Sequence, residues 1–191
     1  MVSLLAPLKL YIDLTDAQFF QLCQNNRDYR FERTATGEVI IMPPTGAETG
    51  ERNAEITYQL KAWNHQNKLG KAFDSSTGFK LPNGSERSPD ASWVKLEKWD
   101  ALTKAEKEGF APCCPDFVVE LMSISDSLEK TRSKMKEYID NGAKLGWLIN
   151  RKEQLVEIYR TNKEVEILQT PLTLSGEEVL FGFVLNLAEI W

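Results

Sequence analysis

The chain has 191 residues with a formal net charge of −5 at pH 7, and 42% of its residues are hydrophobic and 27% charged. This length and composition are typical of one globular domain and exclude a disordered, fibrous or collagen-like chain. No apolar run approaches the roughly 20 residues that cross a bilayer, so we expect no membrane segment. The apolar N-terminus lacks the charged start and cleavage site of a signal peptide.

Cysteine and histidine usage narrows the chemistry further. The three cysteines, Cys23, Cys113 and Cys114, are a poor disulfide framework, which favours a reducing cytoplasm. The one histidine, His65, lies in a polar stretch typical of a helix end, so histidine-based catalysis is not expected. The acidic balance argues against a broad nucleic-acid surface, but it allows a local basic stripe or a site where metal ions neutralise carboxylates.

The first elements are a helix and a hairpin. Thr15 and Gln18 have the spacing of a capping box and predict a helix over residues 16–26. Alternating polarity over 29–33 and β-branched residues over 38–42 then predict two paired strands.

A second helix is predicted in the next segment. Thr45 and Glu48 have the spacing of another capping box, and Gly70 marks the expected helix end. Between them, three apolar residues follow the period of an amphipathic helix: Ile56, Leu60 and Trp63.

Short strands and an insertion occupy the middle of the chain. Residues 72–73, 78–81 and 91–94 read as strands separated by turns. The charged stretch 97–114 reads as an insertion with one short helix.

The most apolar part of the chain comes next. Residues 117–122 are nearly all apolar, as in a central strand buried on both faces, and 145–149 form a second such strand. Between them, Ser125, Asp126 and Ser127 are expected to cap a helix that runs to about Asn141.

These elements predict one domain over residues 1–191, of class α/β (α+β), with a mixed central sheet flanked by helices. Within it we expect an N-terminal helical segment over 1–27 and a core over 28–191. The core ends in a β-rich tail with strands near 156–159, 165–168 and 182–187.

Two acidic residues on consecutive core strands are the first candidates for chemistry. Asp90 follows Pro89 at a strand start, and Glu120 interrupts the most apolar strand. A buried carboxylate needs a partner, and a shared divalent cation such as Mg²⁺ would account for both. The alternatives are a turn role for Asp90 and a solvent-facing strand end or an ion pair for Glu120.

A lysine on the following helix is the second candidate. The apolar stripe of residues 128–139 is flanked by Lys134, which could reach inward over the buried face. Lys130 and Lys136 point elsewhere around the helix. The alternative is that all these lysines belong to a solvated basic face.

The order Pro89-Asp90, Glu120, lysine resembles the constellation of PD-(D/E)XK nucleases. From about residue 15 to the C-terminus the chain is also similar to the Uma-two type restriction endonuclease family of that superfamily. The similarity lies in GEVIIMPPTGAETGERNAEI, DSSTGFKLPNGSERSPDASWV, CPDFVVELMSISDSLEKTRSKMKEYIDNGAKLGWLIN and LSGEEVLFGFVLNL. It implies a restriction-endonuclease-like fold with a mixed central β-sheet flanked by helices.

The resemblance also implies site residues. Asp90 and Glu120 would bind Mg²⁺, with Mn²⁺ as an alternative ion. The lysine of the parent motif lies two residues after the second acid, where this chain has Met122. Lys134 matches a lysine that has moved to the following helix, and Lys136 is the alternative.

A third acid is expected from the first core helix. Glu48 is the best match, with Glu51 and Glu55 as alternatives, and Glu48 could equally complete the capping box with Thr45. The implied metal set is therefore Asp90, Glu120 and Glu48.

The function implied is a Mg²⁺-dependent endonuclease that hydrolyses phosphodiester bonds in DNA with a metal-activated water. Lys134 would orient that water or neutralise charge developing on the phosphate. The alternative is a catalytically inactive nuclease-fold module for binding or assembly, which Met122 and the charge of −5 favour. We expect a homodimer, because five tryptophans and the C-terminal Ile190 and Trp191 offer apolar surface, and the cysteine usage places it in the cytoplasm.

Overall fold

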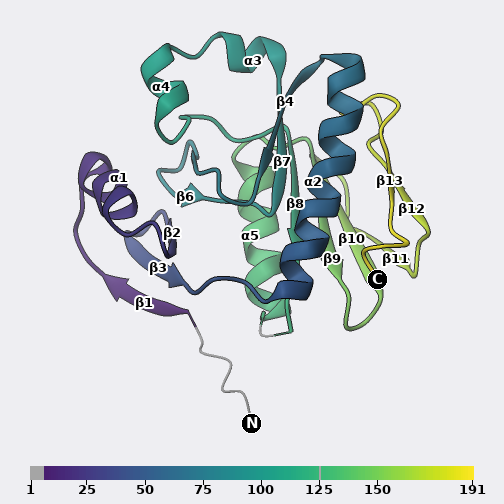
Figure 1. Cartoon of the computed structure of the whole chain (residues 1–191), viewed down its shortest axis with the longest axis horizontal. Coiled ribbons are helices and arrows are strands. Elements are labelled where there is room, and N and C mark those ends of the chain that lie inside the picture. The colour runs from purple at the N-terminus through teal and green to yellow at the C-terminus, as the bar shows by residue number, and fades with distance from the viewer. Residues whose placement is uncertain (1–6, 125) are drawn as a thin grey trace.

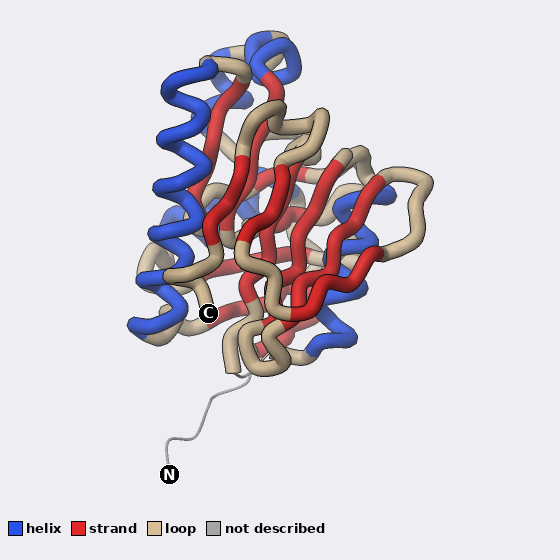
Figure 2. The backbone as a smooth tube through the Cα atoms, turned by 90° about the vertical axis from the view of Figure 1, so that its right-hand side faces the viewer, coloured by secondary structure: helices blue, strands red, loops and turns tan. Residues whose placement is uncertain are grey.

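A mixed six-stranded sheet forms the centre of the computed structural model, which describes residues 7–124 and 126–191. Only its two central neighbours, β8 and β9, run parallel. Figures 1 and 2 show α2 (Ala47–Asn67) and α5 (Leu128–Asp140) on opposite faces of this sheet. The strand order is β11 (Glu166–Gln169), β10 (Leu155–Arg160), β9 (Leu145–Asn150), β8 (Phe117–Leu121), β7 (Ala91–Lys95) and β4 (Gly70–Asp74).

Strand β8 is buried on both faces, as its apolar sequence predicts. Phe117, Val119 and Leu121 pack into the cluster that contains the apolar residues of α2. Val118 packs into the cluster on the α5 face. Because side chains alternate along a strand, Glu120 also lies on the α5 face.

A smaller five-stranded sheet lies beside the first, together with α1 (Asp16–Asn25) (Figure 1). The predicted helix and hairpin are confirmed, including the capping box of Thr15 and Gln18. The strand β1 was not predicted, because its partner β3 lies about 30 residues further along the chain. Residues 7–27 therefore contain a strand as well as the predicted helix. The strand order is β1 (Leu8–Tyr11), β3 (Glu38–Met42), β2 (Arg30–Arg33), β6 (Glu86–Arg87) and β5 (Phe79–Lys80).

The C-terminal residues form the predicted β-rich tail. Strands β12 (Thr173–Ser175) and β13 (Val184–Asn186) pair and bury Leu174 and Leu185 in the same cluster as the apolar face of α2. Ile190 is fully buried there, and the indole N–H of Trp191 donates to Pro171 O at 3.0 Å. The apolar C-terminus is thus covered by its own chain.

Helix α2 differs from its prediction at both ends. Its N-cap is Gly46, which makes no side-chain capping bond, so the prediction of a capping box at Thr45 and Glu48 is wrong. The helix ends at Lys68, which adopts a φ of +55°, and Gly70 is the first residue of β4. The spacing of a capping box is therefore present without its hydrogen bonds.

The insertion and the remaining polar residues largely follow expectation. Residues 97–114 contain part of α3 (Leu96–Asp100) and all of α4 (Lys104–Glu108), two short helices where one was predicted. His65 is exposed in the last turn of α2, and the three cysteines are free thiols. The predicted cap residue Ser125 lies outside the described residues, and Ser127 is the N-cap of α5.

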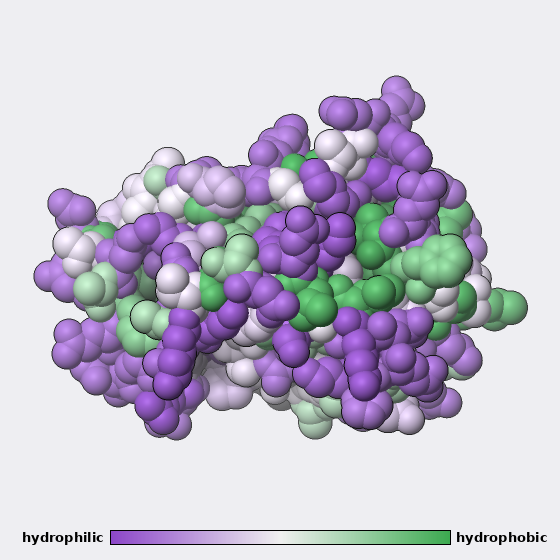
Figure 3. All heavy atoms as spheres, turned by 90° about the horizontal axis from the view of Figure 1, so that it is seen from above, coloured by the Kyte–Doolittle hydropathy of each residue, from purple (hydrophilic) through white to green (hydrophobic). Residues whose placement is uncertain are grey.

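The surface seen from above, near α3 and α4, is mainly hydrophilic with smaller hydrophobic areas between the polar side chains (Figure 3). Within residues 7–124 and 126–191, no helix has the length and apolar character needed to cross a membrane.

Gly70 is required by close packing, which gives a test of the fold. A Cβ at this position would lie 2.2 Å from Val94 O and 2.4 Å from Trp93 Cε2. We expect Gly70→Ala to lower the free energy of unfolding by about 1–3 kcal/mol, because overpacking forces backbone to move. Urea denaturation measures the change.

Gly50→Ala is the matched control. A Cβ at Gly50, inside α2, would meet only Thr45 Cγ2 at 3.6 Å. Alanine there should raise stability by about 0.5–1 kcal/mol, since glycine weakens a helix interior. Equal effects of the two substitutions would show that the packing at Gly70 is not as described.

Candidate functional site

Asp90 and Glu120 lie side by side at the ends of β7 and β8. Ala91 pairs with Val119, so Asp90, one residue before β7, reaches the level of Glu120. Asp90 Oδ2 accepts a hydrogen bond from the backbone N–H of Leu121 at 2.9 Å. The two side chains are only 15% and 10% exposed. The sheet register thus brings together two carboxylates that are 30 residues apart in sequence.

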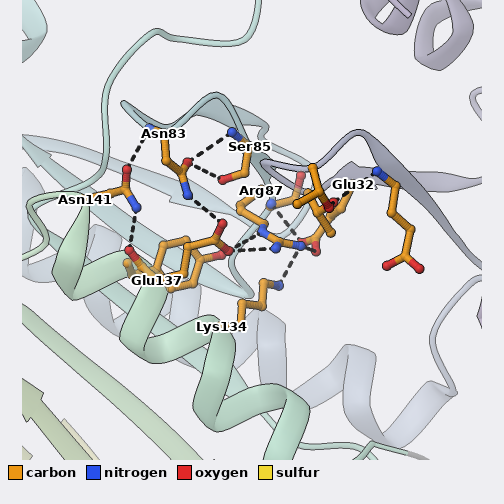
Figure 4. Close-up of polar contacts among 12 residues, drawn as sticks. Glu32, Asn83, Ser85, Arg87, Lys134, Glu137 and Asn141 are labelled. Atoms are coloured by element: carbon orange, nitrogen blue, oxygen red, sulfur yellow. Dashed lines mark hydrogen bonds and ion pairs between the residues drawn. The ribbon is translucent and has the colours of Figure 1, made fainter. Parts of the chain in front are cut away.

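Lys134 joins this acidic pair from α5. Its Nζ lies 2.9 Å from Glu120 Oε1 and 2.7 Å from Glu32 Oε1, and the side chain is 17% exposed. The hydroxyl of Tyr138, one helical turn further along, donates to Glu120 Oε1 at 3.0 Å. Figure 4 shows Lys134 extending from α5 toward Glu32. The lysine therefore lies between two buried carboxylates from different sheets.

Arg87 holds Glu32 from the other side. Its guanidinium lies 3.1 Å from Glu32 Oε2 and 2.7 Å from Glu137 Oε2 (Figure 4). The backbone N–H of Ser88 also donates to Glu32, at 3.1 Å. Asn83 adds a bond to Glu137 at 2.9 Å. These contacts link the small sheet to α5 and fix the position of the carboxylate that binds Lys134.

Burial makes both acids of the pair hard to ionise. It raises the pKa of Glu120 to about 7, with Lys134 opposing the shift and Asp90 adding to it. Burial also raises the pKa of Asp90, although the charges of Arg30 and Lys134 act against it. A cation bound between the two carboxylates would relieve this cost.

Glu32 and Lys134 behave as an ion pair. Burial would raise the pKa of Glu32, but the cationic groups of Lys134 and Arg87 outweigh it and lower the pKa to about 2. Burial disfavours the ammonium of Lys134, yet Glu120 and Glu32 outweigh that effect and raise its pKa above the ordinary value. Lys134 is therefore a fixed positive charge and not a proton acceptor at neutral pH.

Other residues named from the sequence have different surroundings. Glu48 is 76% exposed and pairs with Arg52 at 3.6 Å and Arg151 at 3.5 Å. Lys136 is 73% exposed and pairs with Asp140 at 3.0 Å. Met122 is partly buried against the cluster on the α5 face. Of the two lysines considered, Lys134 is the one that reaches Glu120.

The contributors to the cluster that sequence reasoning missed include Glu32, Asn53 and Arg30. Glu32 sits in a strand whose alternation suggested one solvent-facing side, but both faces of β2 are covered over residues 31–33. Asn53 of α2 donates from Nδ2 to Asp90 Oδ1 at 3.1 Å, and Arg30 Nη1 lies 3.8 Å from the same atom. The spacing of Asn53, three residues before Ile56 of the predicted apolar stripe, was the available signal for its place on the inner face of α2.

A metal ion is implied by the family resemblance, and the residues present fit one. Buried carboxylates are the hard oxygen ligands that Mg²⁺ and Mn²⁺ prefer, and Mg²⁺ commonly uses only one or two of them. In the described part of the chain, no three His, Cys, Asp or Glu side chains gather as a metal-binding group. The acidic part of the site is therefore the pair Asp90 and Glu120.

The arrangement of layers defines the class of the protein. A mixed central sheet with helices on both faces is the fold expected of a restriction-endonuclease-like protein. The model of the Uma2 family, described as "Putative restriction endonuclease", matches residues 16–188, and the chain therefore belongs to this family. Membership supports a nuclease function and a nucleic-acid substrate.

A solved structure shares the fold. The crystal structure of a putative nuclease belonging to DUF820 from Anabaena variabilis superposes with a TM-score of 0.65 at 19% sequence identity. The similarity covers 78% of this chain and 82% of that chain. None of the curated proteins compared with the chain matches it significantly.

The buried state of Glu120 predicts how stability depends on pH. In the unfolded chain this carboxyl has a pKa near 4.5 and is ionised above pH 5, whereas in the folded protein its pKa is about 7. The folded state therefore binds more protons between these values, so stability falls as pH rises. We expect a loss of roughly 1–3 kcal/mol from pH 5 to pH 8 in metal-free protein.

Urea unfolding at four pH values in EDTA tests this dependence. Glu120→Gln should make the slope of stability against pH shallower. Glu86, whose pKa burial also raises to about 7, adds a slope of the same sign, so the slope should not vanish. Identical slopes in wild type and Glu120→Gln would show that Glu120 does not titrate as described.

Proposed function

We propose that this protein is a metal-dependent endonuclease that hydrolyses phosphodiester bonds in DNA. The observation that carries the proposal is the buried pair Asp90 and Glu120 with the ammonium of Lys134 2.9 Å from Glu120. Two carboxylates at adjacent strand ends, with a lysine from α5 beside them, are groups that metal-assisted phosphoryl chemistry uses. Membership of the Uma2 family supports the same reaction class.

Asp90 and Glu120 would hold Mg²⁺, or Mn²⁺ in its place. The ion supplies Lewis-acid polarisation of the scissile phosphate and lowers the pKa of a bound water. The N–H of Leu121 orients Asp90, and the hydroxyl of Tyr138 orients Glu120, so both carboxylates are held in place before substrate arrives. Such preorganisation is what a transition-state-stabilising site needs.

Lys134 would act on the phosphate as a positive charge. Its raised pKa keeps the ammonium protonated, which suits neutralising charge that develops on phosphate oxygens. Arg30, 3.8 Å from Asp90, adds a second cation at the same place. Local positive charge of this kind lets a chain with a net charge of −5 approach a polyanion.

A catalytically inactive nuclease-fold module is the second candidate. Met122 occupies the position of the motif lysine, and Lys134 is bound to Glu32 as well as to Glu120. A protein of this kind would bind DNA or a partner without cutting. Binding of DNA without cleavage in Mg²⁺ or Mn²⁺ would favour it.

The acid pair gives the direct test of the proposed activity. We expect the double variant Asp90→Asn, Glu120→Gln to lose metal-dependent cleavage of plasmid, linear and single-stranded DNA. The amides preserve the size of the side chains and can still accept the bonds from Leu121 and Tyr138, so circular dichroism should report an unchanged fold. Cleavage at the wild-type rate would mean that the site is elsewhere.

Lys134 is tested separately from metal binding. Lys134→Ala should lower turnover about 10²–10³-fold, which is the typical effect of removing one group that stabilises the transition state. It should change metal affinity much less. Lys136→Ala is the matched control on the same helix and should cleave like wild type. Lys134→Arg keeps a positive charge beside Glu32, and it is the second variant to measure if Lys134→Ala does not fold. Equal losses of turnover and metal affinity in Lys134→Ala would indicate a structural lysine.

A homodimer and a cytoplasmic location are further parts of the proposal. A two-fold dimer would present two sites to the two strands of a duplex. The covered C-terminus removes one argument for a dimer, whereas Leu172 and Phe181 remain 79% and 76% exposed. Sedimentation equilibrium measures the oligomeric state directly.

A further inference from the structure

Asn53 contacts Asp90 from α2, the helix on the opposite face of the sheet from α5 (Figure 2). Its Nδ2 donates to Asp90 Oδ1 at 3.1 Å, and the residue is only 6% exposed. The other end of the same amide, Oδ1, is buried and has no hydrogen-bond partner among residues 7–124 and 126–191. Buried polar atoms are nearly always partnered, so an unpartnered oxygen on a side chain that holds the buried carboxylate of Asp90 needs an explanation.

Helix geometry prevents the acids of α2 from taking the place of Asn53. At 100° per residue, Glu48 lies about 140° around the helix from Asn53, and Glu51 and Glu55 lie about 160° away. Glu48 faces Arg52 and Arg151, and Glu55 accepts a bond from Gln59 at 2.9 Å. The side chain that α2 presents to Asp90 is therefore a neutral amide.

We propose that Asn53 Oδ1 is the third protein ligand of the metal site, together with Asp90 and Glu120. This inference rests on the proposed metal-dependent function. Carbonyl oxygens join carboxylates readily as ligands of Mg²⁺ and Mn²⁺. The single Asn53 amide would then both orient Asp90 through Nδ2 and bind the ion through Oδ1.

A neutral third ligand also fits the charge of the site. Two carboxylates balance the charge of one divalent cation, whereas a third acid ligand would reduce the positive charge that the site presents to the phosphate. That difference is important in a chain whose net charge is already −5. The amide thus lets the site bind an anionic substrate without additional repulsion.

Two substitutions separate a ligand from a residue that only positions Asp90. Asn53→Ala removes both the oxygen and the N–H donor. Asn53→Asp keeps an oxygen ligand and removes the N–H donor. If Oδ1 binds the ion, Asn53→Ala binds Mn²⁺ about tenfold or more weakly, and Asn53→Asp binds it at least as tightly as wild type. If Asn53 acts only through its N–H, both variants bind more weakly.

The experiment is titration of the full chain with Mn²⁺. Binding is measured by calorimetry and by the electron paramagnetic resonance signal of free Mn²⁺. Glu48→Gln is the matched control on α2 and should bind like wild type. Circular dichroism checks folding, and Asn53→Leu, which fills a similar volume without an oxygen, replaces the alanine variant if that variant does not fold.

The outcomes are distinct. Wild-type affinity in Asn53→Ala, or weakened binding in both Asn53→Ala and Asn53→Asp, would overturn the ligand assignment. If Glu48→Gln binds Mn²⁺ more weakly and Asn53→Ala binds it normally, Glu48 and not Asn53 is the metal ligand from α2. If wild type binds no Mn²⁺, the proposed function itself fails. Loss of binding only in Asp90→Asn, Glu120→Gln would retain that function and reject Asn53.

Discussion

The ammonium of Lys134 between Glu32 and Glu120 is the interaction on which the arrangement of this protein depends. It joins three elements: β2 of the small sheet, β8 of the large sheet and α5. A charge buried this deeply is tolerated only when it is paired, and removal of one partner leaves another buried charge uncompensated. The small sheet is therefore tied to the large one at the candidate site.

The surrounding contacts extend this constraint. Arg87 joins Glu32 to Glu137, so the same helix that supplies Lys134 also receives the second branch of the network. Tyr138 packs in the apolar cluster of α5 while its hydroxyl bonds Glu120. Packing and polar contacts thus fix one helix in rotation and in position along the sheet. This fixed helix allows a lysine outside the usual motif position to reach the second acid.

The two faces of the large sheet contribute differently to the site. On one face, α2 and the C-terminal strands cover a mainly apolar cluster, and Asn53 of α2 reaches Asp90. On the other face, α5 supplies the cation and the hydroxyl. Asp90 lies at the end of its strand, where both helices have access. A strand end between two helices is a place where carboxylates can be buried and still be reached by a substrate.

The sequence by itself determined the local elements and supplied the two candidate acids. Capping at Thr15, the apolar run of β8 and the stripe of α5 predicted helices and strands because local periodicity controls them. The pairing of β1 with β3, the uncapped start of α2 and the burial of Glu32 depended on contacts distant in sequence. Only the tertiary structure could show that Lys134 is shared and that Asn53 meets Asp90. The physical reason is that a helix period specifies which residues share a face, whereas sheet register and helix rotation decide what that face meets.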